Sequence, residues 1–289
     1  MALNSSLAEG ALAGDYRIVK KIAEGGMGEV FLVIDTAHSE EETCVLKSVL
    51  CGSHGDAKEA LKEAKVLKDI RHPNIVQYLD VFPNQEAYKG IIAVCTVMEY
   101  CARGDLAIHL TEFKKRQGGG REGLKEEVVV TWMTQLLRAV SYLHSVQVLH
   151  RDMKPHNVFI TTHADLKIGD FGLATSLARK KVTSRVGTPS YIAPEVLQYD
   201  GYGEPVDLWG VGCLAYEMMT LDFLFERQGM LASGTHMHAR THACTHARAR
   251  ARARAHTHTH THTHTHTHTH THSLTHSLTH SLTHLNQHH

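Results

Sequence analysis

A glycine-rich run near the start of the chain has the composition of a phosphate-binding turn. Glu24-Gly25-Gly26-Met27-Gly28-Glu29-Val30 lies between two segments of strand-like sequence. Glycines let a tight turn bring backbone N–H groups against phosphate oxygens. Many hairpins are rich in glycine, so this run by itself is weak evidence for a phosphate site.

A lysine in the next expected strand could supply positive charge to the same phosphates. Lys47 comes about 17 residues after the glycine run, and a buried lysine needs a partner. The helix that follows offers Glu63, so Lys47 could hold phosphate oxygens while Glu63 holds Lys47. The alternative is that Glu63 is one of many charges on an amphipathic helix.

A second cluster of polar residues is more specific. The run from His150 to Asn157 reads His-Arg-Asp-Met-Lys-Pro-His-Asn, and Asp170-Phe171-Gly172 begins thirteen residues after Asn157. Further along come Gly187-Thr188-Pro189, Ala193-Pro194-Glu195 and Asp207-Leu208-Trp209-Gly210. In order and spacing, these motifs resemble those of eukaryotic protein kinases.

The resemblance implies a two-lobed α+β fold and a known chemistry. A β-rich small lobe is expected over 16–99, after an N-terminal extension at 1–15, and a helical large lobe over 100–234. The implied activity is transfer of the ATP γ-phosphate to Ser or Thr hydroxyls of protein substrates. Two features resemble those of the Ser/Thr-specific branch of the family: Lys154, two residues after Asp152, and the run Gly187-Thr188-Pro189.

Within that branch the chain is most similar to the NIMA-related kinases. The first piece of the resemblance is Val97-Met98-Glu99-Tyr100-Cys101 with Gly104-Asp105-Leu106, and the second is Met219-Thr220-Leu221 with Phe225-Glu226. The resemblance covers roughly Tyr16–Gly229.

The same resemblance implies a role for each site residue. Asp152 would accept the substrate hydroxyl proton, Lys154 would steady the γ-phosphate, and Lys47 would pair with the α- and β-phosphates. Asn157 and Asp170 would hold Mg²⁺, which favours hard oxygen ligands. The implied nucleotide-binding residues are Ala23, Glu24, Gly25, Gly26, Gly28, Val30, Val45, Lys47, Glu63, Met98, Glu99, Cys101, Asp105 and Phe159.

Some of these assignments carry detail. Ala23 stands where the family's pattern has its first glycine. Met98 resembles the gatekeeper residue, and adenine would bond to backbone groups at Glu99 and Cys101. Thr188 is expected to contact Asp152 and Lys154, whereas His150 is expected to pack against Phe171 as structural support.

The hydrophobic pattern supplies the elements that must position these groups. Strands are predicted over 16–23, 29–34, 43–49, 76–82 and 91–99. Helices are predicted over 58–70, 125–145 and about 207–220, with a Gly- and Lys-rich loop over 113–123. Strands precede helices, which favours two lobes of different class.

Composition excludes several other classes of protein. No apolar run approaches the roughly 18 residues of a membrane span, so no membrane association is expected. Residues 1–234 carry 25 Lys and Arg against 30 Asp and Glu, so no nucleic-acid partner is expected. The six cysteines are scattered without C-x-x-C spacing, which favours a reducing cytoplasm, with a nuclear or cytoskeletal location as alternatives.

The C-terminal segment, 235–289, has a different composition. It consists of Thr-His, Ala-Arg and Ser-Leu repeats, and contains 18 of the 26 histidines. Such a segment has too few apolar residues for a core, so disorder is expected. A translated simple DNA repeat explains its codon-periodic blocks, and a His-rich metal-binding tract is the alternative.

The family pattern also predicts a missing part. Kinase-like sequence stops near Gly229, so the later helices of the large lobe are expected to be absent, and with them the arginine that would pair with Glu195. An alternative function follows, in which the chain is a catalytically weak or inactive kinase fragment that at most binds ATP or a partner.

Overall fold

The computed structural model describes residues 7–25, 28–37, 42–84, 92–118, 122–171, 175–176, 188–198 and 202–225. The chain divides into two compact units, Met1–Met237 and His238–His289. The expectations for the repeat segment 235–289 fall outside the described residues, as does the expected role of Gly26.

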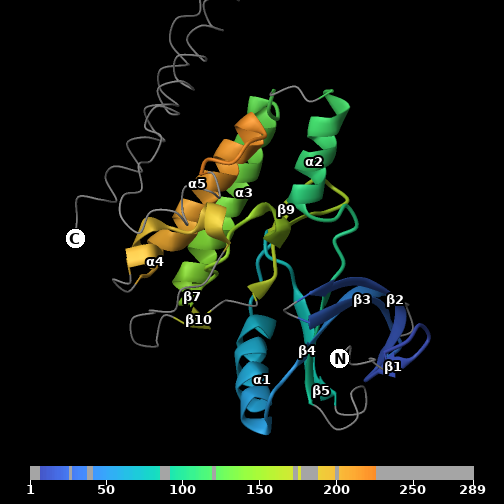
Figure 1. The fold of residues 1–289 in the computed structure, drawn as a ribbon. Coiled ribbons are helices and arrows are strands. Elements are labelled where there is room, and N and C mark those ends of the chain that lie inside the picture. Colours follow the sequence, from blue (N-terminus) through green and yellow to red (C-terminus); the bar gives the residue numbers. More distant parts are fainter. Residues whose placement is uncertain are drawn as a thin grey trace, which may run out of the picture. The chain divides into compact units, whose positions relative to one another are not determined.

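The first half of the larger unit is a six-stranded antiparallel sheet with the order β1-β2-β3-β4-β6-β5 (Figure 1). Its strands are β1 (Leu12–Ala13), β2 (Tyr16–Gly25), β3 (Gly28–Asp35), β4 (Thr43–Leu50), β5 (Tyr78–Asn84) and β6 (Ala93–Glu99). The five predicted strands are confirmed, although β5 and β6 each begin two residues later than expected. In β4 the buried residues alternate along the strand, so Lys47 lies on the opposite face from Leu46.

One helix packs on this sheet. α1 (His54–Lys68) begins four residues before the predicted start because Ser53 caps it, accepting the Asp56 N–H at 3.2 Å. It contacts β5 and β6, and Ala57 is its one buried residue. The helix is therefore held mainly along one narrow face.

The second half is largely helical. Its helices are α2 (Leu106–Arg116), α3 (Glu126–Ser145), α4 (Pro194–Gln198) and α5 (Pro205–Thr220), with 3₁₀ turns at Pro155–Asn157 and Pro189–Tyr191. Four short strands form two pairs, β7 (Val148–Leu149) with β10 (Thr175–Ser176) and β8 (Val158–Ile160) with β9 (Leu166–Ile168). α3 and α5 lie side by side (Figure 1). The predicted α+β fold is confirmed.

One predicted loop is wrong in part. Phe113–Arg116, assigned to the loop over 113–123, form the last turn of α2. The Lys-rich composition suggested a mobile segment, but Lys and Arg at a helix C-terminus favour the helix dipole. Asp105 caps the other end by accepting the Ile108 N–H at 2.8 Å.

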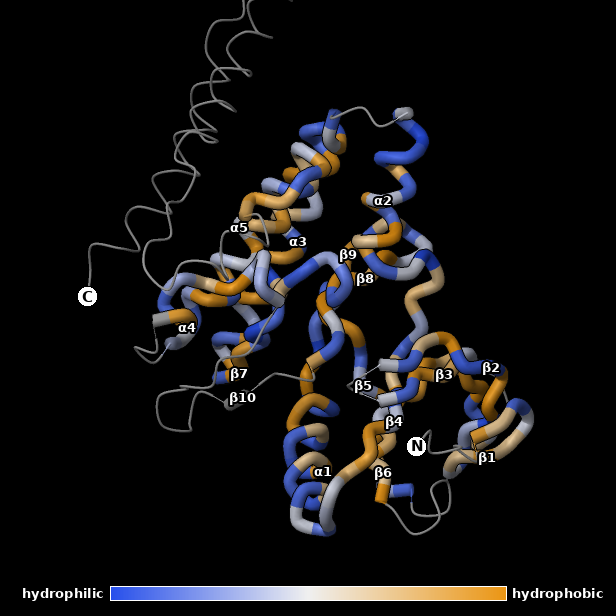
Figure 2. Tube along the Cα trace, viewed as in Figure 1, coloured by the Kyte–Doolittle hydropathy of each residue, from blue (hydrophilic) through white to orange (hydrophobic). Residues whose placement is uncertain are grey.

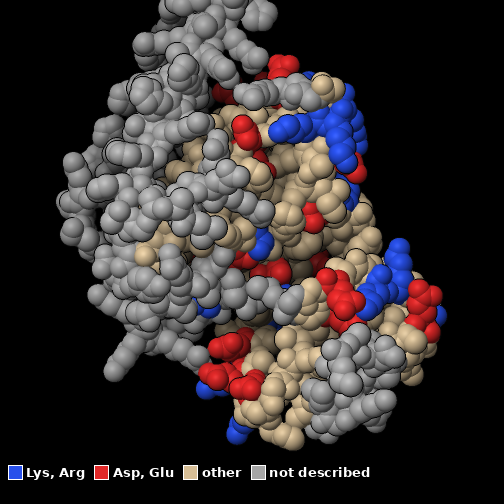
Figure 3. All heavy atoms as spheres, viewed as in Figure 1, with Lys and Arg blue, Asp and Glu red and all other residues tan. Residues whose placement is uncertain are grey.

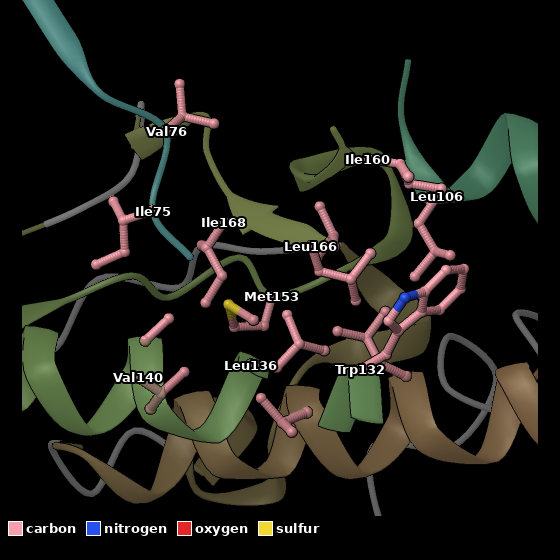
Figure 4. Close-up of a cluster of buried hydrophobic side chains, with 14 of the residues drawn as sticks. Ile75, Val76, Leu106, Trp132, Leu136, Val140, Met153, Ile160, Leu166 and Ile168 are labelled. Atoms are coloured by element: carbon pink, nitrogen blue, oxygen red, sulfur yellow. The ribbon is translucent and has the colours of Figure 1, made fainter. Parts of the chain in front are cut away.

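Most buried apolar residues of the helical half belong to one large cluster, which also contains Met153 of the second motif, and a smaller cluster lies around Val196 and Val206. The buried face of α3 includes Trp132, Leu136 and Val140, as its periodicity predicted. Figure 2 shows the apolar stripes of α3 and α5, and Figure 4 shows Met153 packed among the α3, β8 and β9 side chains. In the described part of the chain, no helix is both long and apolar enough to cross a membrane.

Candidate active site

The described residues on either side of the glycine-rich turn pair across β2 and β3, next to the strand that carries Lys47. Gly25 pairs with Gly28, Ala23 with Val30, and Val30 in turn with Lys47. Gly28 has φ +112°, and a Cβ there would lie 2.2 Å from the Ser48 carbonyl oxygen. Only glycine fits this position, because both the backbone conformation and the close approach exclude a side chain.

Lys47 forms an ion pair with Asp170, from the opposite half of the molecule. Asp170 is therefore a partner of Lys47 that the sequence did not predict, whereas the predicted pair with Glu63, an exposed residue of α1, stays a prediction. Asp170 has φ +51°, a left-handed conformation uncommon outside glycine, and its carboxylate reaches β4. The pair brings the first motif and the second motif into one site.

Apolar side chains from both halves meet beside this ion pair. Val45 pairs with Met98 across β4 and β6, and Met98 is 9% exposed. Val45 and Phe159 both pack against the cluster that contains Met98 and Cys101. The structure thus brings Val45, Met98, Cys101 and Phe159, four of the residues predicted to bind nucleotide, together at one apolar cluster.

The strand end after Met98 presents backbone groups in a pattern that suits adenine. The Glu99 N–H donates to the Gln77 carbonyl at 3.0 Å, so only its carbonyl could serve a ligand. The Cys101 carbonyl accepts the Gly104 N–H at 3.1 Å, and the Cys101 N–H could donate to a ligand. One acceptor and one donor match the amino group and ring nitrogen on an edge of adenine. Burial, and then the Glu99 charge, raise the pKa of the Cys101 thiol to about 11, so it stays neutral.

Asp152 is at the centre of the polar network. Its Oδ2 accepts hydrogen bonds from Lys154 Nζ at 2.5 Å and Asn157 Nδ2 at 3.0 Å. Its Oδ1 accepts the Thr188 N–H at 3.1 Å and the Thr188 hydroxyl at 3.0 Å, and Lys154 also donates to that hydroxyl at 2.9 Å. The predicted contact of Thr188 with Asp152 and Lys154 is confirmed.

This network sets the charge of Asp152. Burial alone raises the pKa of the carboxyl group. The hydrogen bond and positive charge of Lys154 act in the opposite direction, as do hydrogen bonds from Thr188 and Asn157, and the resulting pKa lies below its ordinary value. Asp152 is therefore an ionised acceptor at neutral pH.

Asn157 and Asp170 offer oxygens that fit a divalent cation. The Asn157 side-chain N–H₂ is oriented by the Asp152 carbonyl at 2.7 Å and the Asp152 carboxylate, which leaves the amide oxygen as its ligand atom. The Gly169 N–H donates to the Asn157 carbonyl at 2.9 Å, so the segment before Asp170 is attached to Asn157. An amide oxygen and a carboxylate on connected segments are a donor set that suits Mg²⁺.

Asp207 holds the segment that carries Asp152. It is fully buried, and its carboxylate accepts the backbone N–H of His150 at 3.0 Å and of Arg151 at 2.7 Å. His144 Nε2 of α3 bonds the same carboxylate at 2.8 Å. Arg151 has φ +68°, so this attachment maintains a strained backbone next to Asp152. The sequence motif marked Asp207 but contained no signal for its partners.

Phe171 packs behind the site as predicted and has one unexpected partner. His150 is fully buried and contacts Phe171 edge to face at 4.9 Å between ring centroids, which confirms its predicted packing. The Phe171 N–H donates to the Tyr78 hydroxyl at 3.3 Å, and the two rings also meet edge to face. Tyr78 was missed, because a tyrosine at the start of an apolar strand is typical of ordinary core packing.

Charge on the visible surface is uneven. Lys and Arg gather over the end of α2, where Lys114, Lys115 and Arg116 lie (Figure 3). Lys114 donates to the Leu221 carbonyl at 2.8 Å and Arg116 pairs with Glu112 at 3.0 Å. Two of these three cations therefore have partners within the molecule.

Comparison with known proteins agrees with the geometry. The family model described as protein kinase domain matches residues 16–288. Serine/threonine-protein kinase Nek11 of Mus musculus is 35% identical over 226 residues, which are 76% of this chain and 34% of that protein. Serine/threonine-protein kinase Nek3 of Oryza sativa subsp. japonica is 35% identical over 214 residues, which are 73% of this chain and 34% of that protein.

Another relative is serine/threonine-protein kinase Nek1 of Mus musculus, 32% identical over 217 residues, which cover 74% of this chain and 17% of that protein. The chain spans about a third or less of the length of these curated relatives. The chain belongs to the eukaryotic protein kinases and, within them, to the NIMA-related serine/threonine-protein kinases.

Proposed function

We propose that this chain transfers the γ-phosphoryl group of ATP to Ser or Thr hydroxyls of protein substrates. The observation that carries the proposal is the Asp152 network. An ionised carboxylate already accepts a threonine hydroxyl at 3.0 Å, with Lys154 donating to the same oxygen at 2.9 Å. A substrate hydroxyl in a similar position would lie within reach of both groups.

The proposed step uses residues that the fold brings together. Asp152 accepts the proton as the substrate oxygen forms its bond to the γ-phosphorus, and the bond from that phosphorus to the β–γ bridging oxygen breaks to release ADP. Lys154 places positive charge beside the transferred group, and Lys47 does so at the other end of the site. Preorganised cations of this kind lower the barrier because charge spreads over the phosphoryl oxygens.

Asn157 and Asp170 are the residues that we propose to hold Mg²⁺, which would neutralise phosphate charge when bound. The different partners of Asp152 and Asp170 support different roles for them, Asp152 as the proton acceptor and Asp170 as a metal ligand. Asp152 accepts hydrogen bonds from Lys154 and Asn157 of its own loop and from Thr188, whereas Asp170 pairs with Lys47. The described cysteines are free thiols, which supports our proposal of a reducing compartment, the cytoplasm or the nucleus.

Two lysine variants test the phosphate role. Lys47→Met should abolish phosphate transfer to casein or a peptide library in the presence of ATP and Mg²⁺, and should weaken nucleotide binding to a smaller extent. Lys20→Met is the matched control, because Lys20 is an exposed lysine on β2. Undiminished transfer by Lys47→Met, or equal losses in both variants, would contradict the proposal.

A second candidate function is that of a nucleotide-binding module with little turnover. It is supported by the buried Trp209 Nε1–H, which has no hydrogen-bond partner among the described residues. An unsatisfied buried polar group costs about 1–3 kcal/mol. Trp209 lies on α5, so the helix that contributes Asp207 to the site would be less stable.

The two candidates differ in how much peptide phosphorylation accompanies nucleotide binding. If polypeptide 1–289 is an ordinary kinase, nucleotide binding and peptide phosphorylation should both be measurable. If it is a binding module, a fluorescent ADP analogue should bind while phosphorylation stays at background in a preparation free of other kinases. Early melting of 1–289 would agree with the second candidate.

A further inference from the structure

The strand end that would bind adenine is joined to the helical half by an ion pair. Lys167 Nζ of β9 lies 2.6 Å from Glu99 Oε1, and the side chains are 17% and 27% exposed respectively. The same Glu99 oxygen accepts the Gln77 N–H at 2.7 Å. One carboxylate oxygen therefore joins three segments, namely the start of β5, the end of β6 and β9.

Backbone bonds complete this junction. The Glu99 N–H donates to the Gln77 carbonyl at 3.0 Å, so the two residues exchange bonds in both directions. In the residues just before Gln77, the Val76 N–H donates to the Ile168 carbonyl at 2.8 Å, and the Ile168 N–H donates to the Asn74 carbonyl at 2.9 Å. The segment 74–77 is thus attached both to β9 and to Glu99, and Lys167 links the two attachments.

The position of Lys167 gives the junction a consequence for the site. Lys167 precedes Asp170 by three residues on a strand whose neighbour, Gly169, has no room for a side chain, since a Cβ there would lie 2.8 Å from Val76 Cγ2. Glu99 and Cys101 are the proposed adenine partners. Both ends of the nucleotide site therefore connect to one short strand.

We propose that Lys167 is a positioning residue, and that its clamp with Glu99 and Gln77 sets the geometry of the adenine-binding edge relative to Asp170. The effect on nucleotide rests on the proposed function, whereas the clamp itself does not. Without the lysine, Glu99 would be a half-buried carboxylate with the Gln77 N–H as its one side-chain partner among the described residues, and the strand end would sample more positions. Nucleotide binding would then require additional ordering of the site.

The first measurement needs no nucleotide. In hydrogen–deuterium exchange of the unliganded chain 1–289, Lys167→Met and Glu99→Gln should speed exchange of the Gln77 and Glu99 amides at least about tenfold relative to wild type, since each 1.4 kcal/mol of lost protection is tenfold. Lys65→Met, an exposed lysine on α1, should leave them unchanged. Unchanged exchange in Lys167→Met would overturn the clamp.

The second measurement uses a fluorescent ADP analogue. Lys167→Met should raise its Kd by about 3- to 10-fold, and the double variant with Glu99→Gln should bind no more weakly than the weaker single variant, because both remove one interaction. Lys167→Arg should restore binding, since a guanidinium can also bond the carboxylate. Additive losses, or no rescue by arginine, would overturn the proposal.

The two proposals fail differently. If wild type does not bind the analogue, the proposed function is wrong, and the exchange experiment still decides the clamp. If wild type binds and transfers phosphate, a Lys167→Met variant with a raised KM for ATP and a kcat within about twofold of wild type supports positioning. A loss confined to kcat would contradict it.

Discussion

Replacement of Asp207 by alanine tests how the fold positions Asp152. Asp207 is fully buried, and its carboxylate accepts the His150 N–H at 3.0 Å, the Arg151 N–H at 2.7 Å and the His144 ring at 2.8 Å. Asp207→Ala leaves two backbone donors without an acceptor. Each unpaired donor costs about 1–3 kcal/mol, so the free energy of unfolding should fall by about 2–6 kcal/mol in total.

That loss is large compared with the stability of a domain. Typical domains unfold with about 5–15 kcal/mol, and a domain of this size shifts its melting temperature by about 2–4 °C per kcal/mol. We expect Asp207→Ala to lower the melting temperature by about 4–24 °C and to lose phosphate transfer, because Arg151 and Asp152 would no longer be fixed.

The assay is thermal unfolding followed by circular dichroism, with peptide phosphorylation on the same samples. Asp207→Asn keeps one oxygen acceptor, so its melting temperature should fall less than that of Asp207→Ala. Glu112→Ala is the control, since its pair with Arg116 is exposed and such pairs contribute at most about 1 kcal/mol. An Asp207→Ala variant that melts within about 2 °C of wild type and keeps its activity would refute the reasoning.

Three further predictions follow from the site. Gly28→Ala should destabilise the β2–β3 turn by about 1–3 kcal/mol and raise the KM for ATP, because its Cβ would lie 2.2 Å from the Ser48 oxygen; an unchanged melting curve would exclude that clash. The pKa of Asp152 is lowered in the folded state, so its stabilising effect is complete above about pH 4 and is lost as pH falls through the lowered value. The difference in melting temperature between wild type and Asp152→Asn should therefore be constant from about pH 6 to 8 and shrink in acid. A difference that grows in acid would show that the pKa of Asp152 is not lowered in the folded state. Asp170→Ala should be inactive and wild type should lose activity in excess EDTA, so full activity under either condition would exclude the proposed divalent-metal site.

Much of the fold was predictable because its elements have local causes. The alternation in β4 and the helical spacing of Trp132, Leu136 and Val140 on α3 follow from side-chain periodicity alone. α2 was missed because its last turn is rich in Lys, and the capping bond of Asp105 that starts it is a contact rather than a composition.

The residue types of the site were also visible in the sequence, together with their spacing. Asp152, Lys154 and Asn157 lie within six positions, so their meeting is a local event. The bond of Thr188 to Asp152 was expected from the motif, and the structure has it.

The partners across the molecule were decided only by the tertiary structure. Lys47 pairs with Asp170, 123 positions away, and Lys167 reaches Glu99 across 68 positions. Such pairs depend on how β4, β6 and β9 are placed by the packing of whole elements, and on the left-handed backbone at Asp170. Sequence periodicity determines which face of an element is buried, whereas which charge meets which is fixed by three-dimensional packing, because an ion pair requires only proximity and a suitable dielectric.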